Sequence, residues 1–358
     1  MNRRTPMWLR YQILRMGRKW AYPSARCPVA FCIKACFGLE GFMGLSLFSD
    51  HMLERLQGGR WLVGVSGGGD SVALLRLMIK TGLKDRMVVG NFDHGWSRFG
   101  PESAEFVEKL CARLDVPYVS GKGQAGKACA NSEALARDER YAWFESVVKK
   151  HGLDGVLVAH TRDDVVESFL IRAGKGSGLR GLAGMDAESH WHGMPLVRPL
   201  LDAGREGLRT YLRTMGQEWL DDPDNESGGS QRARVRKLMP QLEAIGISAE
   251  GIAASVHALT DAEAALNAMV AAFEIKDAAK GGLELELGAL QGVGVEIGVR
   301  VLARLMESLQ PYTMVVRRSK RVALLVRLQT EEQGHATLGG LKFEWKQGVL
   351  RARLEQEA

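Results

Sequence analysis

The amino-acid sequence predicts an α/β protein whose N-terminal part is built on a mostly parallel sheet, followed by a helical connector and a small α+β C-terminal domain. Between residues 61 and 174, short apolar runs alternate with helical patterns, which indicates right-handed crossovers between parallel strands. A glycine-rich turn follows the first of these runs. At 358 residues, the chain is long enough to bury more than one core.

The N-terminal pattern divides into strands and helices in chain order. Strands are predicted where apolar residues run continuously, and helices where apolar positions recur at helical spacing before a glycine. The predicted strands are WLVGV (61–65), MVVGNF (87–92), PYVS (117–120) and GVLVAH (155–160). The predicted helices are VALLRLMIKTG (72–82), PESAEFVEKLCARLDV (101–116), NSEALARDERYAWFESVVKKHG (131–152), capped by Asn131 or Ser132, and TRDDVVESFLIRAG (161–174).

The chain changes character after Gly174. A glycine-rich loop, GKGSGLRGLAGM (174–185), is predicted there, and it is longer than a simple turn. It is followed by the segment LVRPLL (196–201), the helix GREGLRTYLRTMG (204–216), a polar stretch (221–240) and an alanine-rich helical region (241–280). The C-terminal residues predict a helix, GVEIGVRVLARLMESL (294–309), and the short strands VALLVRL (322–328), KFEWK (342–346) and VLRARLE (349–355).

These patterns divide the chain into segments. We expect a basic leader at 1–42, a catalytic domain at 43–215, a basic stretch and helical connector at 216–280, and a C-terminal domain at 281–358. The leader lacks periodicity, and we hypothesise that translation starts at Met43. A chain that lacks residues 1–42 is then expected to keep its activity, and the intact mass of the native protein would test this.

The net charge of +6 is unevenly distributed along the chain. Residues 1–42 contain eight Lys and Arg and a single acid, Glu40, so the remaining chain carries a net charge of −1. A surface that binds RNA must therefore be a local patch and not a field over the whole protein.

The cysteines indicate a reducing, cytoplasmic environment. Their number is odd and their spacing irregular, as expected for free thiols: Cys27, Cys32, Cys36, Cys111 and Cys129. A zinc site formed by three of them and His51 is an alternative, but it lacks a Cys-x-x-Cys pair. The most apolar stretch, 29–48, is interrupted by Lys34 and Glu40, so no membrane segment is predicted.

The loop VSGGGDS (65–71) indicates phosphate binding. It lacks the lysine of a Walker loop, so its backbone amides and the following helix N-terminus must hold the anion. Ser66 and Ser71 can donate hydroxyl hydrogen bonds, and Asp70 is best explained as a magnesium ligand or as a favourable residue at the helix N-terminus.

Polar residues follow the other predicted strands. Asp93 and His94 follow the second strand, and His160, Asp163 and Asp164 follow GVLVAH. The carboxyl ends of parallel strands meet at one edge of the sheet, so these residues are expected to line one rim with the loop. Asp163, Asp164 and Glu167 recur at helical spacing, and their alternative role is to stabilise a helix N-terminus.

The loop resembles the SGGxDS pattern of the N-type ATP pyrophosphatases (the PP-loop superfamily), and within them the tRNA(Ile)-lysidine synthetases are most similar. The resemblance covers residues 60–240 and includes FDHGWS, EALARDERYAWF, AHTRDDVVESFLIRAGKGSGLRGLAGM, VRPLL and DDPDN…RARVR, with a fainter likeness at 336–355. It implies an N-terminal PP-loop ATPase domain. It also implies that ATP adenylates the C2 carbonyl of the wobble cytidine in the CAU anticodon of tRNA(Ile). L-lysine then displaces AMP, and pyrophosphate remains in the loop.

The resemblance also implies roles for individual residues. ATP would be bound by Ser66, Gly67, Gly68, Gly69, Asp70, Ser71, Phe92 and Arg140. Catalysis would use Asp70, Asp163, Asp164, Arg137 and His160, with Mg²⁺ on Asp70 and Asp163, or on Asp164 in its place. The cytidine and the tRNA would be contacted by Lys175, Arg180, Arg232, Arg234 and Arg236. Independently of the resemblance, a second basic cluster at Arg317, Arg318, Lys320 and Arg321 is consistent with a surface that faces the tRNA, with an ordinary solvated face as the alternative. The family has an asparagine where this chain has Ala233, so the role of that position is in doubt.

Other functions remain open at this stage. A tRNA-thiolating PP-loop enzyme would need cysteine pairs, which are not visible, and an amidotransferase would need a glutaminase domain. A tRNA-binding module with an inactive nucleotide site is disfavoured because Ser66, Asp70 and Ser71 are intact. The oligomeric state stays open, with a homodimer as one option.

Overall fold

The computed structural model describes residues 48–95, 99–123, 133–221, 230–278, 281–310 and 316–355. Several predictions fall outside these residues: the leader at 1–42, the zinc site that involves Cys27, Cys32 and Cys36, the thiol of Cys129, and the caps Asn131 and Ser132.

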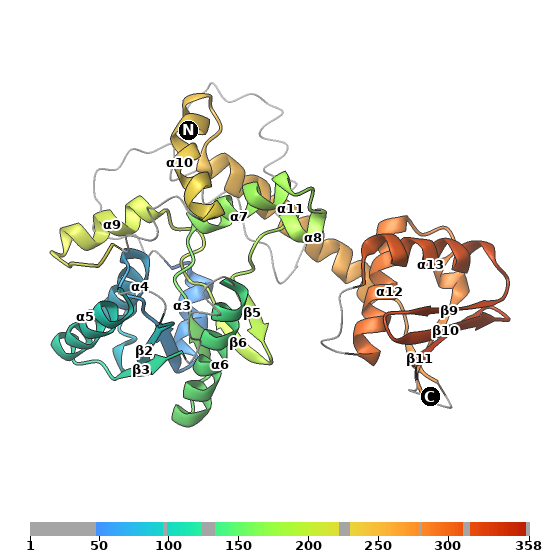
Figure 1. The fold of residues 1–358 in the computed structure, drawn as a ribbon, viewed down its shortest axis with the longest axis horizontal. Coiled ribbons are helices and arrows are strands. Elements are labelled where there is room, and N and C mark those ends of the chain that lie inside the picture. Colours follow the sequence, from blue (N-terminus) through green and yellow to red (C-terminus); the bar gives the residue numbers. More distant parts are fainter. Residues whose placement is uncertain are drawn as a thin grey trace, which may run out of the picture. The chain divides into compact units, whose positions relative to one another are not determined.

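The N-terminal domain alternates strands and helices along the chain (Figure 1). Its strands are β1 (Trp61–Gly64), β2 (Met87–Asp93), β3 (Tyr118–Lys122), β4 (Gly155–Leu157), β5 (Glu188–Trp191) and β6 (Met194–Val197). Its helices are α3 (Asp50–Gln57), α4 (Gly69–Lys80), α5 (Phe99–Leu114), α6 (Glu133–His151), α7 (Arg162–Gly174), α8 (Leu179–Leu182) and α9 (Arg205–Thr214), with a 3-10 turn at Lys84–Arg86. The predicted α/β class is confirmed.

The strands form one sheet in the order β3-β2-β1-β4-β6-β5. All neighbouring strands are parallel except β5 and β6, which are antiparallel. From β1 the chain builds β2 and β3 on one side and then β4 and β6 on the other. The order therefore reverses between β1 and β4, and the loops after these two strands diverge. Open α/β sheets bind their ligands in the crevice at such a point.

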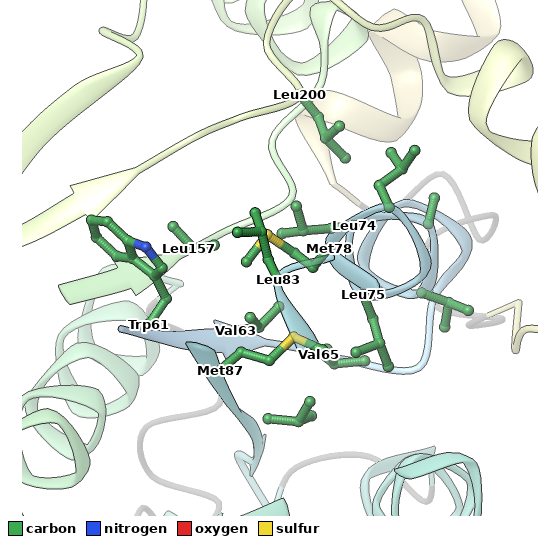
Figure 2. Close-up of a cluster of buried hydrophobic side chains, with 14 of the residues drawn as sticks. Trp61, Val63, Val65, Leu74, Leu75, Met78, Leu83, Met87, Leu157 and Leu200 are labelled. Carbon is green, nitrogen blue, oxygen red and sulfur yellow. The ribbon is translucent and has the colours of Figure 1, made fainter. Parts of the chain in front are cut away.

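Side chains of β1 alternate between two hydrophobic cores. Trp61 and Val63 pack into a core with α3, α4, α5 and α9, whereas Leu62 packs on the opposite face with α6. Figure 2 shows residues of the first core, among them Trp61, Val63, Val65, Leu74, Leu75 and Met78. Each fully buried aliphatic side chain contributes about 1.5–3 kcal/mol, so α4 and the loop before it are firmly anchored on the sheet.

A connector and a second sheet follow. The connector consists of α10 (Gln231–Ala244) and α11 (Ala249–Ala271). The C-terminal domain contains β7 (Lys276–Asp277), β8 (Leu283–Glu286), a 3-10 turn (Leu287–Leu290), α12 (Val295–Leu309), α13 (Arg318–Thr330), β9 (Gly334–Leu338), β10 (Leu341–Lys346) and β11 (Val349–Leu354). Its antiparallel sheet has the order β7-β8-β11-β10-β9. Leu341, Phe343 and Trp345 alternate inward along β10, so the predicted α+β domain is confirmed.

Some local predictions were wrong. Residues 322–328, predicted as a strand, belong to α13, where Leu324, Leu325 and Leu328 are buried at helical spacing. A short apolar run has no periodicity that separates a strand from one turn of a buried helix. The segment 174–185, predicted as a loop, contains the one-turn helix α8. The hairpin strand β5 was not predicted, because its burial is only partial.

None of the described helices is by itself long and apolar enough to cross a membrane. The helices α10 and α11 satisfy length and composition only as a pair, and the chain bends by 106° between them.

Candidate active site

A cavity of about 1150 Å³ opens at the carboxyl edge of the parallel sheet. Its walls come from the loop after β1, the ends of β2 and β4, the first turns of α7 and α9, and one side of α10. Asp93, His94, His160 and Asp164 all line it together with the loop. The rim that the sequence predicts is therefore one continuous surface in the fold.

Three successive carbonyl groups of the loop accept hydrogen bonds from other segments of the domain. The Val65 carbonyl accepts a hydrogen bond from Asn91 Nδ2 (2.8 Å). The Ser66 carbonyl accepts one from Ser103 Oγ (2.7 Å), and the Gly67 carbonyl accepts one from the Leu220 amide (2.9 Å). Asn91 and Ser103 are buried, and they also contact each other. These donors fix the carbonyl oxygens away from the ligand, which would otherwise be repelled by them.

The same arrangement presents backbone N–H groups to the cavity. Gly67 has a φ of +81°, which glycine adopts without the steric strain of a Cβ. Gly68 is the N-cap of α4, so the following amides belong to a helix N-terminus and have no partner within the helix. Ser71 Oγ accepts from the Ser66 amide (3.1 Å) and donates to the Gly68 carbonyl (2.8 Å), which closes the loop on itself. Such a loop binds an anion through backbone dipoles.

Asp70 lies in the first turn of α4 and lines the cavity. Its Oδ2 accepts a hydrogen bond from Arg205 Nε (3.2 Å). Its Oδ1 is buried and has no hydrogen-bond partner among the described residues. Burial raises the pKa of the Asp70 carboxyl, although Arg205 acts in the opposite direction. One carboxylate oxygen is thus available for a further ligand.

The start of α7 carries the other acids. Asp164 forms a capping box with Thr161, whose amide and hydroxyl donate to Asp164 Oδ2 (2.8 and 3.0 Å). Asp163 Oδ2 accepts from the Arg205 amide (2.7 Å), and Asp163 is not among the residues that line the cavity. The Glu167 side chain is only 2% exposed. Asp164 therefore does stabilise the N-terminus of α7 through Oδ2. Its other oxygen, Oδ1, accepts a hydrogen bond from Arg205 Nη2 (3.2 Å).

Arg205 joins these acids, and the sequence analysis did not single it out. Its three guanidinium nitrogens each lie 3.2 Å from a carboxylate oxygen, of Asp70, Asp164 and Glu167 respectively. The side chain is 14% exposed. Arginine is common at the start of a surface helix, so only the fold reveals that this one faces inward.

Helix α10 supplies a second layer of arginines. Arg236 Nε donates to Glu167 Oε1 (3.0 Å), and Arg232 donates to Ser168 Oγ (3.3 Å) and lies 3.8 Å from Asp164 Oδ1. Arg234, between them in sequence, is exposed. The three arginines predicted to contact the tRNA are therefore in different surroundings: Arg232 and Arg236 lie near the acids of α7, whereas Arg234 is exposed.

A basic region lies beside the acids. The guanidinium carbons of Arg137 and Arg140 lie 5.2 and 5.3 Å from the ring centroid of Tyr141. Arg140 lines the cavity, and Arg137 is not among the lining residues. The buried Arg198 donates to the Asp186 carbonyl (2.7 Å) and to Ser189 Oγ (3.0 Å). These are neutral acceptors, so much of its positive charge remains uncompensated.

His160 lies between the two regions. Burial, together with the charges of Arg198, Arg137 and Arg140, lowers the pKa of His160 to about 4, although Asp164 acts in the opposite direction. Its Nδ1 is buried without a hydrogen-bond partner among the described residues. His160 is therefore neutral near pH 7. Phe92, at the end of β2, also lines the cavity, where its ring packs edge-on against His94 at 5.0 Å.

Comparison with known proteins identifies the family to which this chain belongs. The family model described as a PP-loop domain matches residues 47–242. The tRNA(Ile)-lysidine synthase of Rhodopseudomonas palustris is 34% identical over 68% of this chain and 72% of that protein. The chain belongs to the tRNA(Ile)-lysidine synthase family. The synthase of Methylobacterium nodulans is 32% identical over 78% of this chain and 82% of that protein.

Solved structures show a more distant likeness. The U34-tRNA thiolase NcsA from Methanococcus maripaludis is 16% identical to this lysidine synthase family member. The match covers 56% of this chain and 72% of that chain, with a TM-score of 0.46. A likeness of that size carries no argument about function.

Several positions that match the lysidine synthase pattern lie away from the cavity lining. Lys175 is the C-cap residue that follows α7, Arg180 lies in α8, and both side chains are exposed. Ala233 instead is 3% exposed and lines the cavity, where the family has an asparagine. Its methyl group can pack there but cannot form a hydrogen bond.

The site fits a magnesium ion that arrives with the nucleotide. Among the described residues, no three His, Cys, Asp or Glu side chains are arranged to hold a metal by themselves. Mg²⁺ is usually bound by one or two carboxylates together with substrate phosphates. The unpaired Oδ1 of Asp70, next to the anion-binding amides, is suited to this. Asp164 lines the cavity and Asp163 does not, so a second carboxylate ligand is better placed at Asp164.

Proposed function

We propose that the protein uses ATP to join L-lysine to C2 of the wobble cytidine in the CAU anticodon of tRNA(Ile), through an adenylated cytidine, with release of AMP and pyrophosphate. Family membership supports this reaction. The observation that carries it in the structure is a single cavity in which a phosphate-binding loop faces the carboxylate of Asp164, with the buried Glu167 one turn further along α7. The wall formed by the loop suits the phosphates of ATP, and the wall that carries Asp164 suits the lysine amine.

The first half-reaction is a displacement at the α-phosphorus of ATP. The O2 atom of cytidine forms a bond to this phosphorus, and the bond to the bridging oxygen of the β-phosphate breaks. We assign the departing pyrophosphate to the amides of residues 67–70 and to the hydroxyl of Ser66, while the Ser71 hydroxyl, which donates to the Gly68 carbonyl, keeps the loop in shape. Mg²⁺, held by Asp70, would neutralise phosphate charge. Arg140 can stabilise negative charge on the α-phosphate, because it lines the same cavity.

The second half-reaction brings a lysine amine to C2 of the adenylated cytidine. The C–N bond forms, the bond from C2 to the AMP oxygen breaks, and the nitrogen must lose protons. An ammonium group would be stabilised by Asp164, which lines the cavity, and this carboxylate can accept the proton. Neutral His160 can orient the reacting groups by hydrogen bonding without adding charge.

Exposed basic residues are assigned to the tRNA. On α10, Arg234 and Lys237 are exposed. At the start of α13, Arg317, Arg318 and Lys320 are exposed as well. Arginine and lysine side chains bind phosphates and position the RNA without reading its sequence. We therefore propose that these residues hold the tRNA while the cavity selects the cytidine.

The reaction can be tested directly with ATP, labelled lysine and a tRNA(Ile) transcript that contains CAU. Incorporation of lysine with AMP and pyrophosphate release is the expected result. Formation of ADP and orthophosphate, or no product at saturating tRNA, would refute the proposal. Asp70→Asn should abolish adenylate formation with the fold retained, whereas Asp85→Asn, at an exposed position in the 3-10 turn before β2, should be as active as the wild type.

Thiolation of tRNA is the rival reaction. Among the described residues the free cysteine is Cys111, which is buried in α5, and burial raises the pKa of its thiol to about 12. Such a thiol is a poor sulfur carrier. Release of AMP that requires sulfide in place of lysine would favour thiolation. The cytoplasmic location and the homodimer stay predictions, and gel filtration at known concentrations tests the latter.

A further inference from the structure

One arginine contacts three carboxylates, two of which line the cavity of the proposed reaction. Arg205 Nε faces Asp70, Nη2 faces Asp164 and Nη1 faces Glu167, each at 3.2 Å. The carboxylates come from two different helices, α4 and α7, and Arg205 comes from a third, α9. The guanidinium group is therefore the point at which the three helix N-termini are joined.

The position of Arg205 is unfavourable in other respects. It is the first residue of α9, where the positive end of the helix dipole disfavours a cation. The side chain is also largely buried, which costs hydration energy. Only the acids compensate for these costs, and they raise the pKa of Arg205 above its ordinary value. The arrangement is thus stable only while the carboxylates stay ionised around it.

The acids in turn depend on a cation between them. The Asp164 charge raises the pKa of Asp70, so the two carboxylates are close enough to repel each other. Arg236 compensates Glu167, and Arg232 is 3.8 Å from Asp164, but among the described residues neither of these two arginines pairs with Asp70. Asp70 therefore relies on Arg205, with a smaller contribution from Arg209.

We propose that Arg205 is a positioning residue that acts as a built-in counter-ion: it holds the three carboxylates in place and competes with the divalent cation and the lysine amine for them. This inference rests on the proposed function for the identity of the amine. Each incoming cation takes over part of the charge compensation that Arg205 provides, and the fork of the guanidinium keeps the remaining carboxylates aligned.

Two substitutions separate the charge of Arg205 from its shape. Arg205→Met keeps an extended apolar stem and removes the charge, whereas Arg205→Lys keeps the charge and removes the fork. Mn²⁺ alone is the probe, titrated into the ATP-free protein and followed by electron paramagnetic resonance. Steady-state kinetics with varied lysine gives kcat and KM, and thermal unfolding checks the fold. Arg213→Met is the matched control, because Arg213 lies on the same helix, is 55% exposed and pairs with Glu206.

We expect Arg205→Met to bind Mn²⁺ at least tenfold more tightly than the wild type, since a competing charge is gone. Arg205→Lys should bind Mn²⁺ within about twofold of the wild type. Both variants should lose at least tenfold in kcat, and the KM for lysine should fall in Arg205→Met. If Arg205 only stabilised the fold, its substitution would instead raise the KM for lysine and lower the unfolding temperature.

Unchanged or weaker Mn²⁺ binding in a folded Arg205→Met variant would overturn the proposal, as would full kcat in Arg205→Lys. If Arg205→Met does not fold, the kcat and Mn²⁺ affinity of Arg205→Lys decide the question. A wild-type protein that does not ligate lysine refutes the proposed function alone, because the Mn²⁺ comparison needs no turnover.

Discussion

The protonation of His160 should make the stability of the protein sensitive to mildly acidic pH. His160 follows β4, lines the cavity and is largely buried. Burial and the surrounding arginines Arg198, Arg137 and Arg140 lower its pKa from 6.5 to about 4. In the unfolded chain the imidazole regains its ordinary pKa, so the two states bind different numbers of protons between these values.

The sign follows from the direction of the shift. Below pH 6.5 the unfolded chain takes up a proton at this histidine, whereas the folded protein does not until the pH approaches 4, so stability falls as the pH is lowered through this window. With pKa values of 6.5 and about 4, the loss between pH 7 and pH 5 is about 2 kcal/mol. Below pH 4 both states are protonated, and this contribution becomes constant.

The assay compares the wild type with His160→Gln, which cannot titrate. Urea unfolding at pH 7 and pH 5 gives a change in unfolding free energy for each protein, and the difference between these changes isolates His160 from all other titrating groups. We expect about 2 kcal/mol, with the wild type as the more acid-sensitive protein. Equal acid sensitivity of the two proteins would show that His160 is either solvated or stabilised as a cation in the folded state.

Further predictions concern the loop and the tRNA surface. Gly67→Ala should destabilise the protein by about 1–2 kcal/mol and raise the KM for ATP, because an L-residue is strained at positive φ; urea unfolding and initial rates measure this. Ser103→Ala leaves the Ser66 carbonyl without its donor and should cost about 1–3 kcal/mol, and an unchanged KM for ATP would contradict its positioning role. Arg234→Gln should weaken tRNA binding and reduce the slope of log affinity against log salt by about 0.7–0.9, as measured by filter binding.

Local patterns predicted the frame of the site because they depend on neighbouring residues. The apolar runs of β1, β2 and β4 each end at the cavity, and the helices predicted after all three of them are present as α4, α5 and α7. Because parallel strands carry their ligand sites at one edge, these runs were sufficient to place residues 65–71 beside His160 and Asp164. Strand lengths were less well predicted, since β4 ends at Leu157 and the following residues form the rim.

Contacts between distant segments could not be predicted in this way. Arg205 lies 135 residues from Asp70, and the Leu220 amide binds the Gly67 carbonyl from a segment with no motif of its own. Neither residue stands out by type or spacing. The strand predicted at 322–328 failed for a related reason: whether a short apolar run becomes helix or strand depends on what packs against it, and α12 packs against it here.

The chemistry of the cavity explains why its phosphate loop contains backbone amides and no lysine. The proposed reaction binds a polyanion first and a cationic amine afterwards, so positive and negative groups must share one cavity without neutralising each other. A mobile lysine in the loop would pair with Asp70, which lies in the same turn. Amide dipoles fixed by Asn91 and Ser103 cannot move to do so. The side-chain cations that pair with the acids, above all Arg205, come from other helices than the loop and the acids do. Fixed dipoles for the anion and exchangeable counter-ions for the acids allow both charges to coexist, which predicts that a lysine introduced at Gly69 would weaken ATP binding despite its charge.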